Sequence, residues 1–159
     1  MHMLNKLSLF TVTACLLAFT AFSQKPATGN TGTQKFKPPK TYSSLGSYKD
    51  SSSITVAEAE RIISLPLKIV DDKKMDYKVT SYQFMYKRKA VTEDEKTGKV
   101  SPTTSISADR FTASPLPKLW IKTIRERVTS GEELFFFDII VKDNQGRVMY
   151  APNIRLLVK

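Results

Sequence analysis

The run Leu134–Val141 constrains the fold more than any other segment, because it is apolar throughout except for one carboxylate. At the two-residue period of a β-strand, one face is wholly apolar: Phe135, Phe137, Ile139 and Val141. The opposite face carries Leu134, Phe136 and Ile140 together with Asp138. Large apolar side chains on both faces predict a central strand that is buried on both sides.

Shorter strand-like segments surround this run, and polar turns separate them. They are Leu67–Val70, Asp76–Lys87, Lys99–Phe111, Arg147–Tyr150 and Ile154–Val158. In the second segment Tyr82, Phe84 and Tyr86 share one face at the two-residue period. Strands at such regular, short spacing predict a mainly β fold, specifically a β-sandwich with one or two short helices.

The first predicted helix begins after a capping box. The Thr55 hydroxyl and the Glu58 carboxylate are spaced to satisfy the first free backbone amides of a helix. The helix should end near Ser64, because Pro66 disfavours helical geometry at the residue before it and cannot extend a helix.

A second short helix is predicted after Ser114–Pro115, with the serine as N-cap and the proline in the first turn. Apolar side chains then recur at helical spacing: Leu116, Leu119, Trp120 and Ile124. Gly131 is expected to close this helix, and Trp120 is expected to pack in the core rather than stack on a ligand.

Residues 1–23 have the pattern of a secretory signal peptide. Lys6 supplies a positive charge, residues 7–22 carry none, and small side chains precede a predicted cleavage between Ser23 and Gln24. We therefore expect an exported protein of the periplasm or cell envelope, with no membrane-spanning segment after cleavage.

Two alternatives to cleavage remain open. The apolar run could stay as a membrane anchor, although it is shorter than the roughly 20 residues that a span needs. Alternatively, Val12-Thr13-Ala14-Cys15 resembles a lipobox, which would make Cys15 the lipidated residue of a lipoprotein.

Residues 24–52 are rich in Ser, Thr, Gly, Pro and Lys and contain almost no aliphatic side chains. Such a segment buries too little apolar surface to offset the entropy of ordering, so it predicts a disordered basic linker. Phe36 is the one residue of this segment that suggests docking to a partner; the alternative, which we favour, is that the segment is a solvated tether. The folded domain is accordingly predicted to span residues 53–159.

The chain has few side chains of the types that usually carry out catalysis. The chain has one His and one Cys, His2 and Cys15, and both lie in the predicted signal. Serine–histidine and cysteine–histidine nucleophiles, thiolate or imidazole zinc sites and disulfides are thereby excluded from the mature chain. No glycine-rich phosphate loop is present either. We expect no enzymatic activity, no cofactor and no metal.

Apart from Lys6 in the predicted signal, the formal net charge of +10 is spread over linker and domain, without an aromatic and basic motif that would indicate nucleic acid. Anionic envelope surfaces or simple solubility explain it better. The one basic cluster that suggests a binding surface is Lys87-Arg88-Lys89, which follows Tyr86 at a strand end. It would suit a carboxylate-rich partner or lipid head groups; the alternative is a solvated face that discourages edge pairing.

Acidic residues are further candidates for a site. Asp138 interrupts the apolar strand and is interpreted as a structural acceptor rather than a general acid, since no motif supplies a second catalytic group. Asp71-Asp72 and Glu93-Asp94-Glu95 contain calcium-type ligands, but each is followed closely by lysine, which disfavours calcium.

The segment Thr129–Val158 resembles the C-terminal domain of the gliding-motility protein GldM, a periplasmic component of the type IX secretion and gliding machinery. The resemblance lies in Gly131-Glu132, in the apolar run to Lys142, in the turn ending at Gly146 and in the strand Ile154–Val158. Upstream, Thr55–Ile69 and Tyr77–Phe84 are similar to the opening of that domain.

This resemblance covers about residues 54–158 and implies an immunoglobulin-like β-sandwich in a periplasmic setting. GldM itself has a membrane helix and several stacked domains, so this chain looks like a stand-alone version of its last domain. Type IX secretion or gliding components are the partners that the resemblance implies.

Three functions follow from these observations. The favoured one is a non-enzymatic envelope protein that binds another protein through sheet edges or an exposed apolar face. The alternative is a small carbohydrate-binding or hydrolytic module, in which acids such as Asp109 and Asp138 would have to converge. Weak homo-oligomerisation through open sheet edges is the third.

Overall fold

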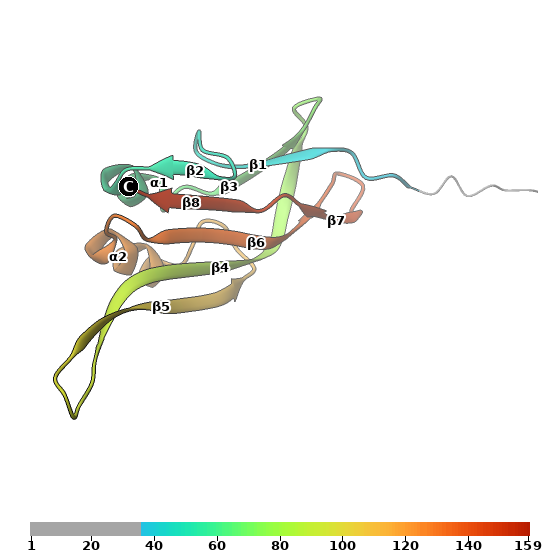
Figure 1. Cartoon of the computed structure of the whole chain (residues 1–159). Coiled ribbons are helices and arrows are strands. Elements are labelled where there is room, and N and C mark those ends of the chain that lie inside the picture. Colours follow the sequence, from blue (N-terminus) through green and yellow to red (C-terminus); the bar gives the residue numbers. More distant parts are fainter. Residues whose placement is uncertain (1–35) are drawn as a thin grey trace, which may run out of the picture. The chain divides into compact units, whose positions relative to one another are not determined.

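The computed structural model describes residues 36–159, and these form one unit (Figure 1). Its strands are β1 Thr41–Leu45, β2 Ser52–Ile54, β3 Leu67–Asp71, β4 Asp76–Glu93, β5 Val100–Phe111, β6 Glu133–Lys142, β7 Val148–Ala151 and β8 Ile154–Val158, and its helices are α1 Val56–Ile62 and α2 Lys118–Arg127. The predicted mainly β, sandwich-like fold with two short helices is confirmed. The predicted signal peptide, the Ser23–Gln24 cleavage site, Cys15 and residues 24–35 of the predicted linker lie outside the described residues.

The strands form a curled eight-stranded sheet in the order β1-β3-β4-β6-β8-β2, with β5 paired to β4 and β7 to β6. Every pairing is antiparallel except that of β2 with β8, which is parallel. The 18 residues of β4 hold the sheet together, because its first residues pair with β3 and its later ones with β5. The β4–β5 hairpin extends beyond the body of the domain (Figure 1).

The core lies on the inner face of β4 and β6, where aromatic rings interlock. Tyr82, Phe84 and Phe136 are almost completely buried, and their ring centroids lie 4.7 Å (Phe84–Phe136) and 5.9 Å (Tyr82–Phe136) apart. From α2, the Trp120 ring meets those of Phe84 and Phe111 in edge-to-face geometry, with centroids 5.4 Å and 5.8 Å apart. Aromatic pairs in this geometry stabilise beyond the area that they bury. They fix α2 across β4 and β5.

The folded domain begins earlier than the sequence predicted. The segment assigned to a linker contains all of β1 and the first residue of β2, so the start of the domain moves from residue 53 to Thr41. In β1 the alternate side chains Thr41, Ser43 and Leu45 are buried, and the strand pairs antiparallel with β3. Backbone pairing with an existing strand orders this segment, although it contributes only one aliphatic side chain to the core.

Helix α1 begins as predicted, with both halves of the capping box formed. The Thr55 hydroxyl accepts a hydrogen bond from the Glu58 amide at 3.3 Å, and the Glu58 carboxylate accepts one from the Thr55 amide at 2.8 Å. The helix ends at Ile62, close to the predicted stop. Two otherwise free amides are thereby satisfied.

The predicted start of the second helix was wrong. Helix α2 begins at Lys118, with Pro117 rather than Ser114 at its N-cap. The Ser114 hydroxyl instead accepts a hydrogen bond from the Leu67 amide at 2.7 Å, which ties the segment before α2 to β3. Ser114 thus bonds to a residue that is distant in the sequence, and not to the start of the helix that its position before a proline predicts. Gly131 lies beyond the helix end, with a φ of 86°.

The alternation predicted for β6 holds only for its first half. Ser81 pairs with Ile140 but Gln83 pairs with Phe137, so β6 carries one extra residue at this point. Asp138 adopts a φ of 48°, in the left-handed region, and forms the bulge. The inner face therefore carries Leu134, Phe136, Ile139 and Val141, which are all buried. Phe135 and Phe137 point to the outer face, contrary to the prediction that they share a face with Ile139 and Val141.

Candidate functional site

The predicted basic cluster is divided between the two faces of β4. Tyr86 is buried and Arg88 half-buried on the inner face beneath α2, whereas Lys87 and Lys89 are exposed on the other face. Alternation along a strand separates neighbours in this way, so the four residues do not form one surface. The side chain of Lys89 lies against Gly131.

Phe36 lies at a different place from this cluster. Its ring is 41% exposed and lies under the Arg147 guanidinium, whose carbon is 4.0 Å from the ring centroid. Arg147 also donates to the Asp143 carboxylate at 2.6 Å in the turn before β7. Phe36 is therefore anchored to the β6–β7 turn by a cation–π contact.

Apolar side chains gather on the outer face of the sheet, across β5, β4, β6 and β8. We call them the outer-face patch, which consists of Met85, Ile106, Phe135, Phe137 and Leu157. The rings of Phe135 and Phe137 stack with centroids 5.0 Å apart and planes 10° apart. Ile106 is 60% exposed and Leu157 43% exposed. Helix α2 packs on the inner face through Trp120, so it does not cover this patch.

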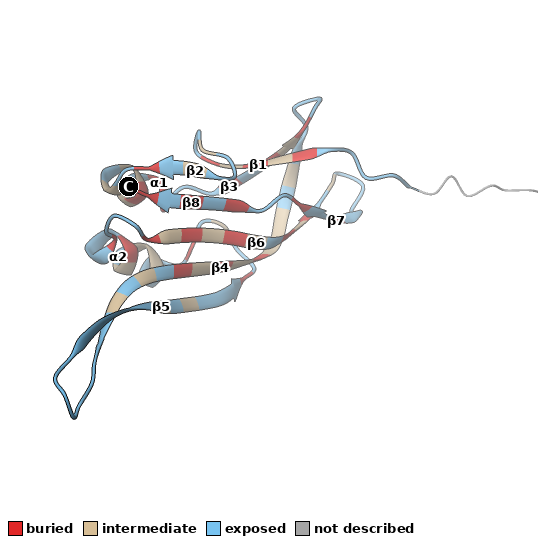
Figure 2. Cartoon of the chain, viewed as in Figure 1, coloured by how far each residue is buried: buried red, intermediate tan, exposed pale blue. Residues whose placement is uncertain are grey.

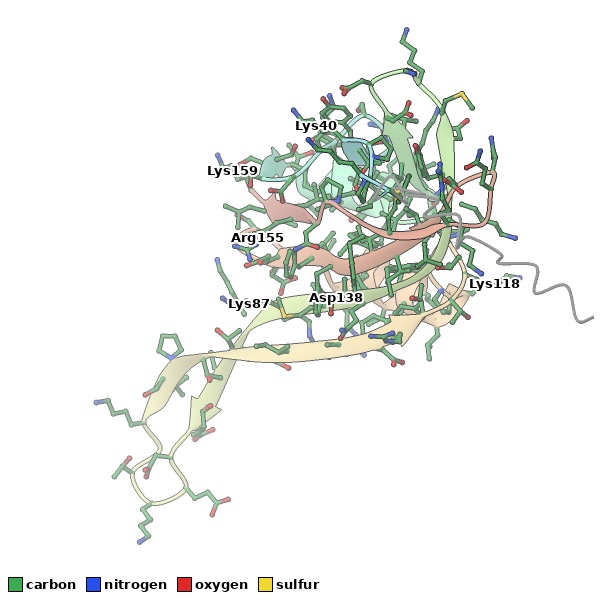
Figure 3. All side chains as sticks on the ribbon, turned by 90° about the vertical axis from the view of Figure 1, so that its right-hand side faces the viewer. Lys40, Lys87, Lys118, Asp138, Arg155 and Lys159 are labelled. Carbon is green, nitrogen blue, oxygen red and sulfur yellow. The ribbon has the colours of Figure 1, made fainter. Side chains whose placement is uncertain are left out.

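Charged and polar groups border the outer-face patch. Arg155 donates to the Glu133 carboxylate at 3.0 Å and lies over the Phe135 ring at 4.6 Å. Asp138, on its bulge, accepts a hydrogen bond from the side-chain Nε2 of Gln83 at 2.6 Å. Lys87, Asp138 and Arg155 are labelled in Figure 3. An apolar centre with a polar rim is the usual anatomy of a protein–protein interface.

The end of the β4–β5 hairpin is solvent-exposed on both strands (Figure 2). Val91 is 71% and Val100 57% exposed, although both are β-branched apolar residues. Strand β5 pairs only with β4, so its other edge presents free backbone groups among the described strands. Free edges of this kind pair readily with another chain.

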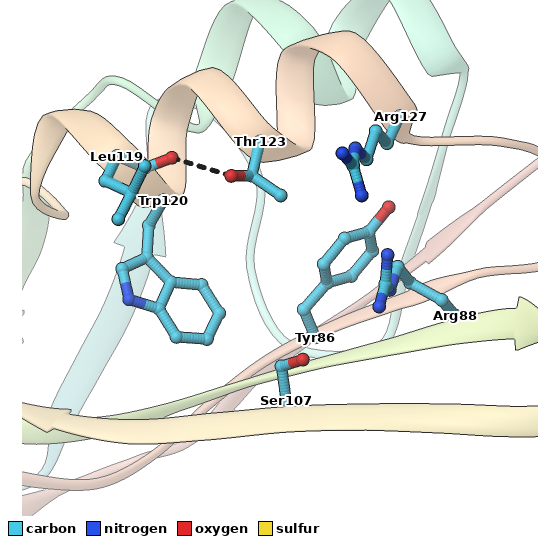
Figure 4. A pocket seen from close by; sticks show the side chains of 7 residues that line it. All are labelled: Tyr86, Arg88, Ser107, Leu119, Trp120, Thr123 and Arg127. Atoms are coloured by element: carbon cyan, nitrogen blue, oxygen red, sulfur yellow. Dashed lines mark hydrogen bonds between the residues drawn. The ribbon is translucent and has the colours of Figure 1, made fainter.

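A cleft of about 290 Å³ opens on the inner side of the sheet, between α2 and the strands β4 and β5 (Figure 4). The Tyr86 hydroxyl lies in its floor and donates to the buried Glu132 carboxylate at 2.5 Å. Burial first, and then this hydrogen bond, raise the pKa of Tyr86 well above its usual value. The sequence pattern alone does not reveal the role of Glu132; the one indication is that this acidic residue directly precedes a strongly apolar strand.

The acidic runs that contain calcium-type ligands cap their own turns. Asp71 accepts hydrogen bonds from the amides of Lys73 and Met75, both at 2.9 Å, and from the Tyr77 hydroxyl at 3.1 Å. The Met75 amide contributes most to lowering the pKa of Asp71. Asp94 accepts from three donors in its turn in the same manner. Across residues 36–159, no three metal-ligating side chains come together.

The acids named for hydrolytic chemistry are not brought together. Asp138 bonds Gln83 on the outer face, whereas Asp109 pairs with Phe84, whose ring is on the inner face. The two carboxylates therefore start from opposite faces of the sheet, and this arrangement provides no convergent pair.

No known family model matches the chain, and no curated protein matches it. In residues 36–159, no helix is long and apolar enough to cross a membrane.

Proposed function

We propose that this chain is an exported, non-enzymatic protein of the cell envelope that binds another protein through the outer-face patch. The observation that carries the proposal is the stacked pair Phe135 and Phe137 on a sheet face that α2 leaves uncovered. Aromatic side chains near the centre of such a patch commonly dominate binding energy, because they bury a large area at little cost in entropy.

The polar rim supports the same function. Arg155 is held in place by Glu133 and by the ring of Phe135, so a partner meets a guanidinium that is already oriented. Groups fixed before binding lose less conformational entropy when the complex forms. The rim thus adds orientation to the affinity that the apolar centre supplies.

The envelope setting rests on residues 1–23, whose pattern is that of a secretory signal. The resemblance of about residues 54–158 to the C-terminal domain of GldM supports partners among type IX secretion or gliding components. In this proposal, such a partner binds at the outer-face patch.

The test is affinity capture from solubilised envelope with tagged Gln24–Lys159 as bait and mass-spectrometric readout. The Phe137→Gln variant removes one ring of the stacked pair, and Met75→Gln is the control, because Met75 is an exposed apolar residue of the β3–β4 turn, outside the patch. We expect stoichiometric, salt-resistant recovery of a partner by the unaltered bait and by Met75→Gln, and at least tenfold less by Phe137→Gln.

Equal recovery by all three baits would refute binding through the patch, provided that circular dichroism shows the same fold for each. Recovery of partners unrelated to type IX secretion or gliding would refute that assignment while leaving the patch as the binding surface. Recovery of nothing by any bait would refute the interaction function itself.

A further inference from the structure

The cleft between α2 and the β4–β5 strands contains two cationic side chains. Arg88 comes from β4 and Arg127 from the last turn of α2; in Figure 4 the Arg127 guanidinium lies near the Tyr86 hydroxyl and the Arg88 guanidinium beside the Tyr86 ring. Among the described residues, neither takes part in a salt bridge. Two positive charges thus face one small cleft without a carboxylate bound to either.

The hydrogen-bonding capacity of Arg88 is only partly used. One terminal nitrogen donates to the Ser105 hydroxyl at 3.3 Å, and the guanidinium carbon lies 5.7 Å from the centre of the Tyr86 ring. The Nε atom is buried and has no hydrogen-bond partner in the described part of the chain. A buried donor without a partner costs free energy, which a bound acceptor would recover.

Glu132, the nearby acid, is already occupied by other donors. Its two oxygens accept hydrogen bonds from the Tyr86 hydroxyl, from the Thr129 amide at 3.0 Å and from the Lys89 amide at 3.3 Å. This carboxylate lies behind the tyrosine hydroxyl and serves the structure. The guanidinium groups therefore remain available to an anion that enters the cleft.

The two arginines of helix α2 make different contacts. Arg125 donates to the Glu60 carbonyl at 2.9 Å and to the Ser64 hydroxyl at 3.0 Å, so it ties α2 to the α1 end of the domain. Arg127 makes no such hydrogen bond within residues 36–159, is exposed and lines the cleft. A helix C-terminus favours a cation in general, but that does not require Arg127 to point into the cleft.

The other end of the cleft is apolar and carries hydroxyl groups. Trp120 and Leu119 form its wall, with Ser107 and Thr123 between them and the arginines. Thr123 donates to the Leu119 carbonyl at 2.9 Å, while Leu119 is 73% exposed. A ligand that fits has an anionic head at one end and an apolar group at the other.

We propose that this cleft binds a peptide carboxylate: Arg88 and Arg127 hold the carboxylate, and Trp120 and Leu119 contact the apolar side chain beside it. Guanidinium groups match the two oxygens of a carboxylate in planar, bidentate geometry. The volume of about 290 Å³ is at the small end for ligand pockets and suits about one or two residues. The site lies on the face opposite the outer-face patch and does not depend on it.

Trp120 gives a direct readout, because it is the single tryptophan of the chain. Tagged Gln24–Lys159 is titrated with acetyl-Gly-Leu bearing a free carboxylate and with its C-terminal amide. A second pair is acetyl-Leu-Glu-Leu-amide and its glutamine analogue. We expect saturable changes in Trp120 emission with at least one carboxylate peptide, at least tenfold weaker binding of the matching neutral peptide, and weaker binding at high salt. Binding of the carboxylate peptide of the first pair would identify a terminal carboxylate as the ligand. Binding of the carboxylate peptide of the second pair would identify a side-chain carboxylate.

Variants test the residues. Arg127→Gln and Arg88→Gln should each weaken binding about tenfold or more, whereas Arg110→Gln, on the outer face of β5, should leave it unchanged. Arg127 is exposed, so its variant stays informative even if Arg88→Gln disturbs the fold. Equal binding of the neutral peptides, unchanged binding by Arg127→Gln, or competition by inorganic phosphate at the same concentration as the peptide would overturn the proposal.

Discussion

Replacing Glu132 by alanine should destabilise the domain more than any exposed charge change, because this carboxylate joins three segments. Glu132 is 3% exposed and precedes β6. It accepts from the Tyr86 hydroxyl in β4 at 2.5 Å, from the Thr129 amide after α2 at 3.0 Å and from the Lys89 amide at 3.3 Å. Alanine leaves all three donors without this acceptor.

The expected cost follows from these contacts. A hydrogen bond to a charged group contributes about 1.5–3 kcal/mol, and an unsatisfied buried donor costs about 1–3 kcal/mol. The Lys89 contact is long and counts for little. The Tyr86 and Thr129 contacts together predict a loss of about 3–5 kcal/mol in the free energy of unfolding for Glu132→Ala. Tyr86→Phe removes one of these contacts and should cost about 1–3 kcal/mol.

The assay is equilibrium urea unfolding, followed by Trp120 fluorescence and circular dichroism. Tyr86→Phe combined with Glu132→Ala should cost less than the sum of the single changes, because both remove the same hydrogen bond. Glu126→Ala is the control, since its contact with Lys122 is an exposed ion pair, and we expect a change within about 0.5 kcal/mol. A loss below about 1 kcal/mol for Glu132→Ala, or strict additivity with Tyr86→Phe, would refute the reasoning.

Two further predictions concern β4 and β6. Burial raises the pKa of Tyr82 to about 12, above the ordinary value of 10.0, so the folded protein keeps a proton that the unfolded chain releases. This contribution to stability is complete below pH 10 and is lost between about pH 10 and 12; urea unfolding of Tyr82→Phe should show a smaller decline there, and an equal decline would contradict the assignment. Asp138→Val should be less stable than Asp138→Gly by about 1–2 kcal/mol in the same assay, because a branched side chain disfavours a φ of 48°. Equal stability of the two variants would mean that the bulge is not maintained.

Features that depend on neighbouring residues could be predicted from the sequence. The capping box of Thr55 and Glu58 is satisfied within four residues, so its pattern sufficed to place the start of α1. The inner face of β4 follows from alternation alone, and Tyr82, Phe84 and Tyr86 are buried as expected. An exposed apolar face was predicted as a binding surface, but the residues that form the outer-face patch were not.

The features that the sequence analysis missed depend on residues far apart in the chain. Strand β1 is ordered by pairing with β3, and Ser114 binds Leu67 rather than the helix it precedes. The bulge at Asp138 changes which side chains of β6 face the core, and an apolar run carries no mark of where its alternation shifts. Because of this bulge, Phe135 and Phe137 lie on the outer face, opposite Ile139 and Val141.

Both candidate sites also depend on contacts between residues that are far apart in the chain. Alternation along β4 separates Lys87 from Arg88, and only the packing of α2 brings Arg127 next to Arg88. Local pattern and composition were enough to predict the mainly β class and the first helix. Composition also places the single histidine and the single cysteine in the predicted signal. Which side chains share a surface could be read only from the folded domain, because strand register, a bulge and helix packing are set by contacts between distant segments.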